Sequence, residues 1–376
     1  MTARRIAVGI SALVLSLIAI AARGTPVGSL GRWGTDHCAH YGASIMFWHV
    51  GLRVFDTPMR ELCVERTSAG LAFERATGLP DNYVCEWPGD RPMVMNWQAY
   101  PRPYPPGALL YAAPEAVLYA HTSLSLYVVD RIAIVKDLLV GHLLVLVLLE
   151  LLAGWQLLLS PLVYAGVVPW AAAGFYDPIA VLLVCWAIVR LERERPLDAL
   201  ACLAGAAFLH FRAIWYVPLG VVALARLRAS PGELRSRRGI LLVAIGLVAV
   251  AGALLALRLA GPSLGTFPRT NPALLTRPSL ATLGFVVLAI AACATLAHHR
   301  QWLLVALVAW QALVIGLTRQ AQFWHPMFLL PLLALGRRAR WPVVIAIVAW
   351  IVGVAILDGT PAMVVRFVHD VATLNV

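Results

Sequence analysis

Long apolar runs, separated by short polar or basic segments, make up most of the chain after residue 130. A run of about twenty apolar residues can cross a bilayer as a helix, because a helix satisfies its own backbone hydrogen bonds. We therefore predict an all-α, polytopic transmembrane bundle of about eleven spans that forms one domain over residues 1–376. The predicted spans are residues 6–22, 132–152, 156–173, 179–189, 197–211, 215–227, 240–257, 281–297, 302–317, 323–335 and 343–357. Several are shorter than twenty residues, so some of these helices are expected to be broken.

The least apolar segment, residues 24–130, is predicted to be one large loop outside the cytoplasm. Residues 24–129 hold seven arginines and nine carboxylates, which is not the basic excess of a cytoplasmic loop. Two amphipathic stretches, 41–55 and 107–119, carry Trp or Tyr beside aliphatic residues and are too polar or too short to span. We expect both to be helices in the membrane interface, and we predict turns at 79–82 and 86–90.

Composition supports lipid as the solvent for much of the surface. Hydrophobic residues make up 61% of the chain and charged residues only 13%, whereas ordinary globular chains are about 25% charged. The mean hydropathy is +0.79. A protein with so little charge cannot cover a water-exposed surface of this size, and we expect an integral membrane protein.

The basic residues fall in short groups between the apolar runs. The predicted cytoplasmic segments hold 14 arginines and four carboxylates. This bias predicts a cytoplasmic N-terminus, with the large loop and the C-terminus outside. A nucleic-acid-binding protein would gather its basic residues on one face, so the net charge of +11 does not indicate nucleic acid. Residues 6–22 could instead be a cleaved signal peptide, but the many later spans favour an uncleaved helix.

The cysteines fall into two groups. Three cysteines in the large loop would face an oxidising compartment, which permits one disulfide in any of three pairings. These are Cys38, Cys63 and Cys85. The other three lie in apolar runs and are expected to pack as small hydrophobic residues. These are Cys185, Cys202 and Cys293.

Two carboxylates lie where the predicted topology meets the outer membrane surface. Asp36 lies between Trp33 and His37, just beyond the first helix, where it can act as a general base or a metal ligand. Asp177 precedes Pro178 between two apolar runs, and an acidic residue at a membrane mouth is a functional candidate. Each has a structural alternative, because Asp is a good helix N-cap and Pro is favoured at the first helical position.

Basic and aromatic candidates lie at the same predicted face. Arg212 could hold a lipid phosphate or could snorkel at the interface. Tyr104 lies in a proline-rich segment, residues 100–107, that leads into the second amphipathic stretch. Arg319 and His325 could meet a phosphate or a sugar hydroxyl, although interface anchoring is the alternative and is favoured for Trp324. Together these residues outline a site at the bilayer surface for a lipid-linked anionic substrate and a second, water-exposed substrate.

The order of these features resembles the GT-C type glycosyltransferases, which include the protein O-mannosyltransferases and the aminoarabinose transferases of lipid A. The pattern extends in order over residues 1 to about 335, and each of its pieces is short. The matching residues are Trp33, Asp36, Tyr104-Pro105-Pro106, Asp177-Pro178, Trp324-His325 and Leu329-Leu330-Pro331.

The resemblance implies transfer of a sugar from a polyprenyl-phosphate donor to a lipid, glycan or protein acceptor on the outer face. By this resemblance Asp36 would be the catalytic base and Asp177 the second catalytic carboxylate. The substrate-binding candidates are His37, Tyr104, Arg212, Arg319 and His325. The chain departs from the family at His37, where a second acid is common, and at Tyr41, which comes one residue late. These departures leave open whether a divalent cation takes part and which acceptor is used.

Two other functions remain as alternatives. A transporter or lipid flippase would need polar groups near the middle of the membrane, and usually an internal repeat. His142 and Glu150 in the second span are candidates for such groups, and no repeat is found. The second alternative is a non-catalytic scaffold whose outer loop binds a partner.

Overall fold

The computed structural model describes most of the chain from residue 105 onward and short pieces before it. The described residues are 43–44, 47, 51–57, 83–87, 91–95, 105–124, 126–152, 154–172, 176–229, 232, 236–264, 279–317 and 325–357. The predicted first span, residues 6–22, lies outside them, as does the predicted C-terminal tail.

Helices form at each predicted apolar run of the described part, and the prediction of a helical bundle is confirmed there. The full helices are α6 (Pro106–His121), α7 (Leu126–Leu151), α8 (Ser160–Ala172), α9 (Asp177–Glu192), α10 (Pro196–Leu209), α11 (Val217–Ala229), α13 (Arg237–Leu264), α14 (Leu280–His298), α15 (Trp302–Leu317), α16 (Pro331–Leu335) and α17 (Trp341–Leu357). Short 3₁₀ helices are η2 (Gly51–Phe55), η3 (Gly154–Leu159), η4 (Phe211–Tyr216) and η6 (His325–Leu329).

The large loop contains structure that the sequence analysis did not predict. Strands β1 (Tyr83–Trp87) and β2 (Arg91–Met95) pair as an antiparallel hairpin around the predicted turn at 86–90. The loop is therefore not purely helical. The stretch 107–119 is helical, as expected, within α6. In the stretch 41–55 the described residues 43–44 and 47 are α-helical, and the end of the stretch is the short 3₁₀ helix η2.

One described helix, α14, is long and apolar enough to cross a bilayer, judged by length and composition. Shorter apolar helices, of 10–17 residues, occur at Gln156–Val168, Pro196–Leu209, Trp302–Leu317, Pro326–Leu335 and Trp341–Leu357. The predicted span 323–335 is broken into η6 and α16. Pro331 begins α16, where the absence of its N–H costs no intrahelical hydrogen bond.

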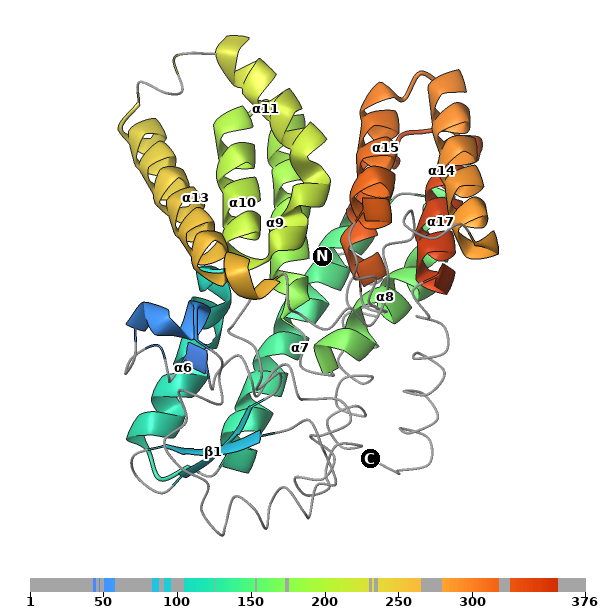
Figure 1. The fold of residues 1–376 in the computed structure, drawn as a ribbon. Coiled ribbons are helices and arrows are strands. Elements are labelled where there is room, and N and C mark those ends of the chain that lie inside the picture. Colours follow the sequence, from blue (N-terminus) through green and yellow to red (C-terminus); the bar gives the residue numbers. More distant parts are fainter. Residues whose placement is uncertain are drawn as a thin grey trace.

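The helices form two groups that share a base (Figure 1). In the first group α10 packs against α9, α11 and α13, and in the second α14 packs against α15 and α17. Helices α7 and α8 pack against each other and run below the two groups in this view, and α6 lies against α7 and α10. This arrangement brings α6 to the end of the bundle where α9 begins and α10 ends.

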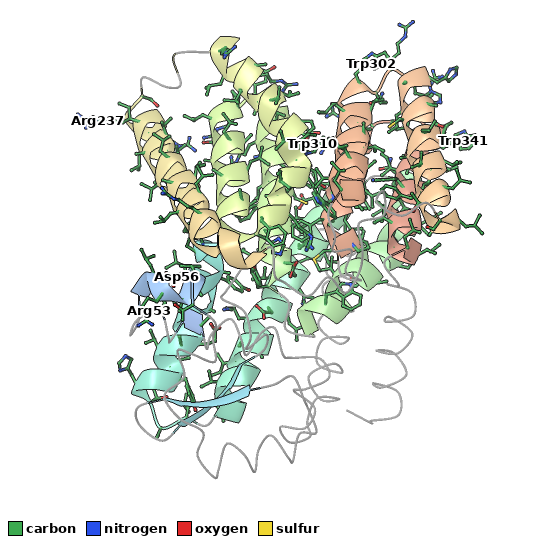
Figure 2. All side chains as sticks on the ribbon, in the orientation of Figure 1. Arg53, Asp56, Arg237, Trp302, Trp310 and Trp341 are labelled. Carbon is green, nitrogen blue, oxygen red and sulfur yellow. The ribbon has the colours of Figure 1, made fainter. Side chains whose placement is uncertain are left out.

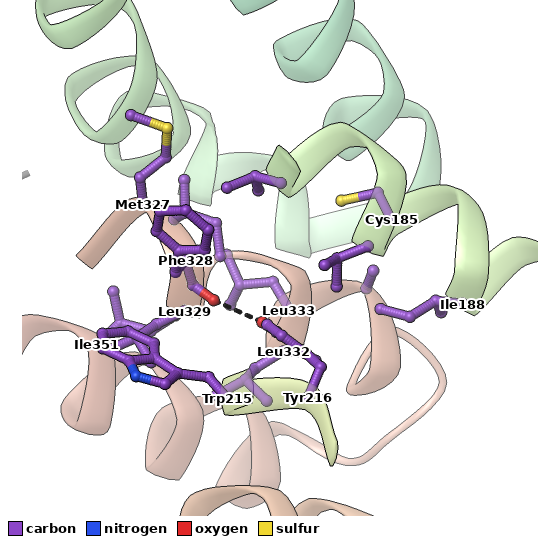
Figure 3. Packing of buried hydrophobic residues seen from close by; sticks show 14 of the residues in the cluster. Cys185, Ile188, Trp215, Tyr216, Met327, Phe328, Leu329, Leu332, Leu333 and Ile351 are labelled. Carbon is purple, nitrogen blue, oxygen red and sulfur yellow. Dashed lines mark hydrogen bonds between the residues drawn. The ribbon is translucent and has the colours of Figure 1, made fainter. Parts of the chain in front are cut away.

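The core joins the two groups where η6 meets α9 and η4 (Figure 3). The Tyr216 hydroxyl donates a hydrogen bond of 2.6 Å to the Phe328 carbonyl oxygen. Both side chains are fully buried, and this bond pairs a buried hydroxyl with a buried carbonyl. Cys185 is a free buried thiol beside this contact, and Cys202 and Cys293 are free and half-buried, as expected for packing residues.

Basic side chains connect the helices at the opposite end of the bundle. The Asp198 carboxylate pairs with Arg195 at 2.8 Å and with Arg238 at 2.7 Å, which ties α10 to the start of α13. Arg337 pairs with Glu192 at the end of α9. Figure 2 shows Arg237 and Trp302 at this upper end, away from Arg53 and Asp56 near α6.

Candidate functional site

A buried polar cluster lies where α9 begins and α10 ends. Asp177 is the first residue of α9, and His210 and Arg212 flank the end of α10 and the start of η4. Because α9 and α10 form an antiparallel pair joined by a short turn, the start of one lies beside the end of the other. This topology brings together residues that are 33 positions apart, Asp177 and His210.

The contacts within this cluster are specific. His210 Nε2 lies 3.4 Å from Asp177 Oδ1, with side chains that are 2% and 3% exposed. The backbone N–H of Arg212 donates to His210 Nδ1 over 3.1 Å. Arg212 itself is 5% exposed, and its guanidinium lies 5.1 Å from the Phe211 ring centroid and 6.0 Å from that of Trp215.

The structure decides two alternatives raised by the sequence. Tyr176, not Asp177, occupies the N-cap position of α9, and Asp177 lies one residue inside the helix. Pro178 is therefore the second residue of α9 and not the first, as the N-cap alternative predicted. Arg212 is buried, so the alternative of an interfacial arginine that snorkels toward solvent is wrong. Asp177 and Arg212 each contact His210, and charged groups buried in this way are costly to maintain and mark a candidate site.

A second polar cluster joins α6 to α7. Lys136 Nζ lies 2.8 Å from both oxygens of Glu115 and donates to the Tyr111 carbonyl oxygen at 2.6 Å. The same ammonium group lies 3.8 Å from the Tyr111 ring centroid. The Tyr111 hydroxyl donates to Asp137 Oδ1 at 2.6 Å. Glu115 and Asp137 are each 1% exposed, so this network holds the two helices together in a buried setting.

Tyr176 lies between the two clusters. Its ring centroid is 6.1 Å from that of Tyr111 and 5.6 Å from that of His210. Burial raises the pKa of the Tyr111 phenol, and the negative charges of Asp137 and Glu115 raise it further. The phenol therefore stays protonated at neutral pH and serves as a hydrogen-bond donor to Asp137.

Helix α6 reaches this end of the bundle by a close approach to α10. A Cβ atom at Gly107 would lie 2.5 Å from the carbonyl oxygen of Phe208, so only glycine allows this packing. The preceding Pro105 is the N-cap of α6, and Pro106 is its first residue. The segment that the sequence identified through its prolines therefore positions α6 against the end of α10.

The predicted site residues have different outcomes. Asp177 and Arg212 belong to one cluster, each in contact with His210 or its ring neighbours. His325 begins η6, and Phe328 of the same 3₁₀ helix lies 5.0 Å from the His210 ring, so η6 reaches this end too. Four predicted site residues lie outside the described part of the chain. These are Asp36, His37, Tyr104 and Arg319.

Sequence reasoning missed the α6–α7 network of Glu115, Lys136 and Asp137. Two signals could have indicated it. Tyr111 and Glu115 are four residues apart and therefore share one face of a helix. Lys136 and Asp137 are ionisable residues within a run otherwise predicted to span, which is a functional signal in itself. The residues expected for a transporter behave differently: His142 contacts the Leu138 carbonyl of its own helix, and Glu150 is exposed.

No family model, curated protein or solved structure matches this chain.

Proposed function

We propose that this protein is a multi-pass membrane glycosyltransferase that moves a sugar from a polyprenyl-phosphate donor to an acceptor on the extracytoplasmic face. The observation that carries the proposal is the cluster of Asp177, His210 and Arg212, buried at one end of an apolar helical bundle. Charged groups are expensive to bury in such a bundle and mark substrate sites.

A membrane setting is supported by the surface of the described helices. Large aliphatic residues on α13 and α14 are widely exposed, among them Val248 at 72% and Leu280 at 88%. Such a surface is stable against lipid and unfavourable against water. The paired arginines at the end opposite Asp177 agree with an orientation in which that end faces the cytoplasm.

The chemistry of the cluster suits a lipid-phosphate donor. Arg212 presents a planar, permanently charged group that can bind phosphate oxygens through two parallel hydrogen bonds. In a dry site this interaction stabilises the charge that appears on the leaving phosphate. Asp177 can accept a hydrogen bond from a sugar hydroxyl and stabilise the positive charge that develops on the ring.

The reaction proposed is a displacement at the anomeric carbon. The bond from that carbon to the donor phosphate oxygen breaks, and the phosphate keeps the electron pair. The acceptor oxygen forms the new bond, and its proton passes to the Asp36 carboxylate. His37, Tyr104, Arg319 and His325 are proposed as further substrate-binding residues. Loss of transfer on addition of a chelator would show that a divalent cation takes part.

The test uses purified protein in lipid nanodiscs and a panel of mannosyl, glucosyl and pentosyl polyprenyl phosphates. Envelope extract from a deletion strain supplies the acceptor, and release of free polyprenyl phosphate is measured. Wild-type protein should consume one class of donor, and Asp177→Asn should lose most of that activity. A wild-type protein that consumes no donor in the panel, together with unchanged envelope glycans in the deletion strain, would contradict the proposal.

A transporter is the second candidate, because the Lys136 network places charge within α7. A transporter reconstituted in sealed lipid vesicles would move an intact glycolipid across the membrane without releasing polyprenyl phosphate. A transferase instead separates the sugar from its lipid carrier.

A further inference from the structure

The His210 imidazole has a different contact at each nitrogen. Its Nδ1 accepts the backbone N–H of Arg212 at 3.1 Å, and a neutral ring nitrogen that accepts a hydrogen bond carries no proton. The single proton of the neutral ring is therefore on Nε2. That nitrogen lies 3.4 Å from Asp177 Oδ1, so the proton on Nε2 is the ring N–H that lies near the carboxylate.

The ring is held in this orientation from several sides. Its centroid lies 4.8 Å from that of Phe211 in a stacked arrangement, and 5.6 Å and 5.0 Å from those of Tyr176 and Phe328. The side chain is 2% exposed. A flipped ring would direct Nδ1 away from the Arg212 N–H, and a proton on Nδ1 would set two donors, Nδ1–H and the Arg212 N–H, against each other.

We infer that His210 is a positioning residue that orients the Asp177 carboxylate for sugar transfer through its Nε2–H. This inference rests on the proposed function, in which Asp177 contacts the sugar. Asp177 lies in the first turn of α9, where its carboxylate can rotate about its side-chain torsions. A contact from a ring that is itself fixed by the Arg212 backbone limits that rotation, as outer partners do for metal ligands and for catalytic groups.

Two substitutions separate the functions of the ring nitrogens. Gln at position 210 can place an N–H donor near the position of Nε2, whereas Asn can place its oxygen near the position of Nδ1. His210→Gln therefore keeps the donor to Asp177 and loses the acceptor for Arg212. His210→Asn keeps the acceptor for Arg212 and loses the donor to Asp177. His298→Asn, at the end of α14 on an exposed turn, is the matched control.

The kinetic test compares these variants in nanodiscs with the polyprenyl-phosphate donor that the wild type consumes. We expect His210→Asn to lose about 10- to 100-fold in kcat with KM nearly unchanged, and His210→Gln to recover most of that loss. In an Asp177→Asn background, His210→Asn should add no further loss, because the two residues act as one unit. His298→Asn should equal the wild type.

The reverse order, with His210→Asn near the wild-type rate and His210→Gln impaired, would overturn the inference. So would a full additional loss in the Asp177→Asn background, which would show that His210 acts independently of Asp177. Either result leaves the proposed function standing, because the wild type still transfers sugar.

A measurement without substrate keeps the two proposals distinguishable. Nitrogen NMR of ¹⁵N-histidine-labelled protein, assigned by comparison with His210→Asn, reports which ring nitrogen carries the proton. The inference expects a proton on Nε2 alone at neutral pH, and a proton on Nδ1 would overturn it. If the Nε2–H form is observed and the wild type uses no donor, the proposed function fails and so does the catalytic part of the inference.

Discussion

Removing the lysine of the α6–α7 network should release α6 from the bundle. Lys136 is the cation that pairs with Glu115, and Glu115 is 1% exposed. Lys136→Met keeps the length and apolar stem of the side chain, but it leaves a buried carboxylate without its lysine. Breaking a buried ion pair in this way costs about 3–5 kcal/mol. Because Lys136 is 25% exposed, we take about 3 kcal/mol as the expected cost.

Hydrogen–deuterium exchange of peptides from α6 (Pro106–His121) measures this release locally. A cost of about 3 kcal/mol corresponds to a loss of about 100-fold in protection, since about 1.4 kcal/mol is one factor of ten. The double variant Glu115→Gln/Lys136→Met should recover most of the protection, because no unpaired charge is then buried. Glu192→Gln, in the more exposed pair with Arg337 at the other end, should leave α6 unchanged.

Equal protection of α6 in Lys136→Met and in the wild type would refute this reasoning. So would a double variant that is less protected than Lys136→Met alone, because the penalty would then come from lost packing and not from the unpaired carboxylate.

Three further predictions concern Gly107, Tyr111 and Arg212. Gly107→Ala should lower stability by about 1–3 kcal/mol, measured by thermal unfolding, because its Cβ would meet Phe208; Gly284→Ala, with open space around it, is the control, and equal effects would count against the close approach. Tyr111 has a raised pKa, so its contribution to stability is present below about pH 10 and lost above it; unfolding midpoints from about pH 9 to 11 should fall more steeply for the wild type than for Tyr111→Phe, and parallel slopes would contradict this. Arg212→Ala should raise the apparent KM for the donor at least about tenfold, with partial rescue by Lys; an unchanged KM would remove Arg212 from the phosphate site.

The helices were predictable because apolar runs and their basic flanks follow from one-dimensional patterns. The run 197–211 became α10 at Pro196–Leu209, within two residues at each end. The meeting of Asp177 with the end of α10 also follows from sequence, since a short turn makes α9 and α10 antiparallel neighbours. The β-hairpin could have been predicted as well, because two short runs that contain Val lie on the two sides of a Pro-Gly-Asp turn.

The α6–α7 network could not be predicted in the same way. Whether Glu115 faces Lys136 depends on the rotation and register of two helices, α6 and α7, that end and begin at different points of the chain. Ridge-and-groove packing fixes that register only in three dimensions. The pairing of His210 with Asp177 likewise depends on the ring orientation set by the Arg212 backbone.

Sugar transfer by Asp36→Asn tests the central claim most directly. Asp36 is the proposed catalytic base, and Asn keeps its shape and its N-capping ability but cannot take a proton. Asp56→Asn is the control, because Asp56 lies in the same loop and is exposed. With purified protein in nanodiscs, we predict that the wild type and Asp56→Asn release polyprenyl phosphate at similar rates and that Asp36→Asn is at least about 100-fold slower. Transfer by Asp36→Asn at the wild-type rate would contradict the catalytic account.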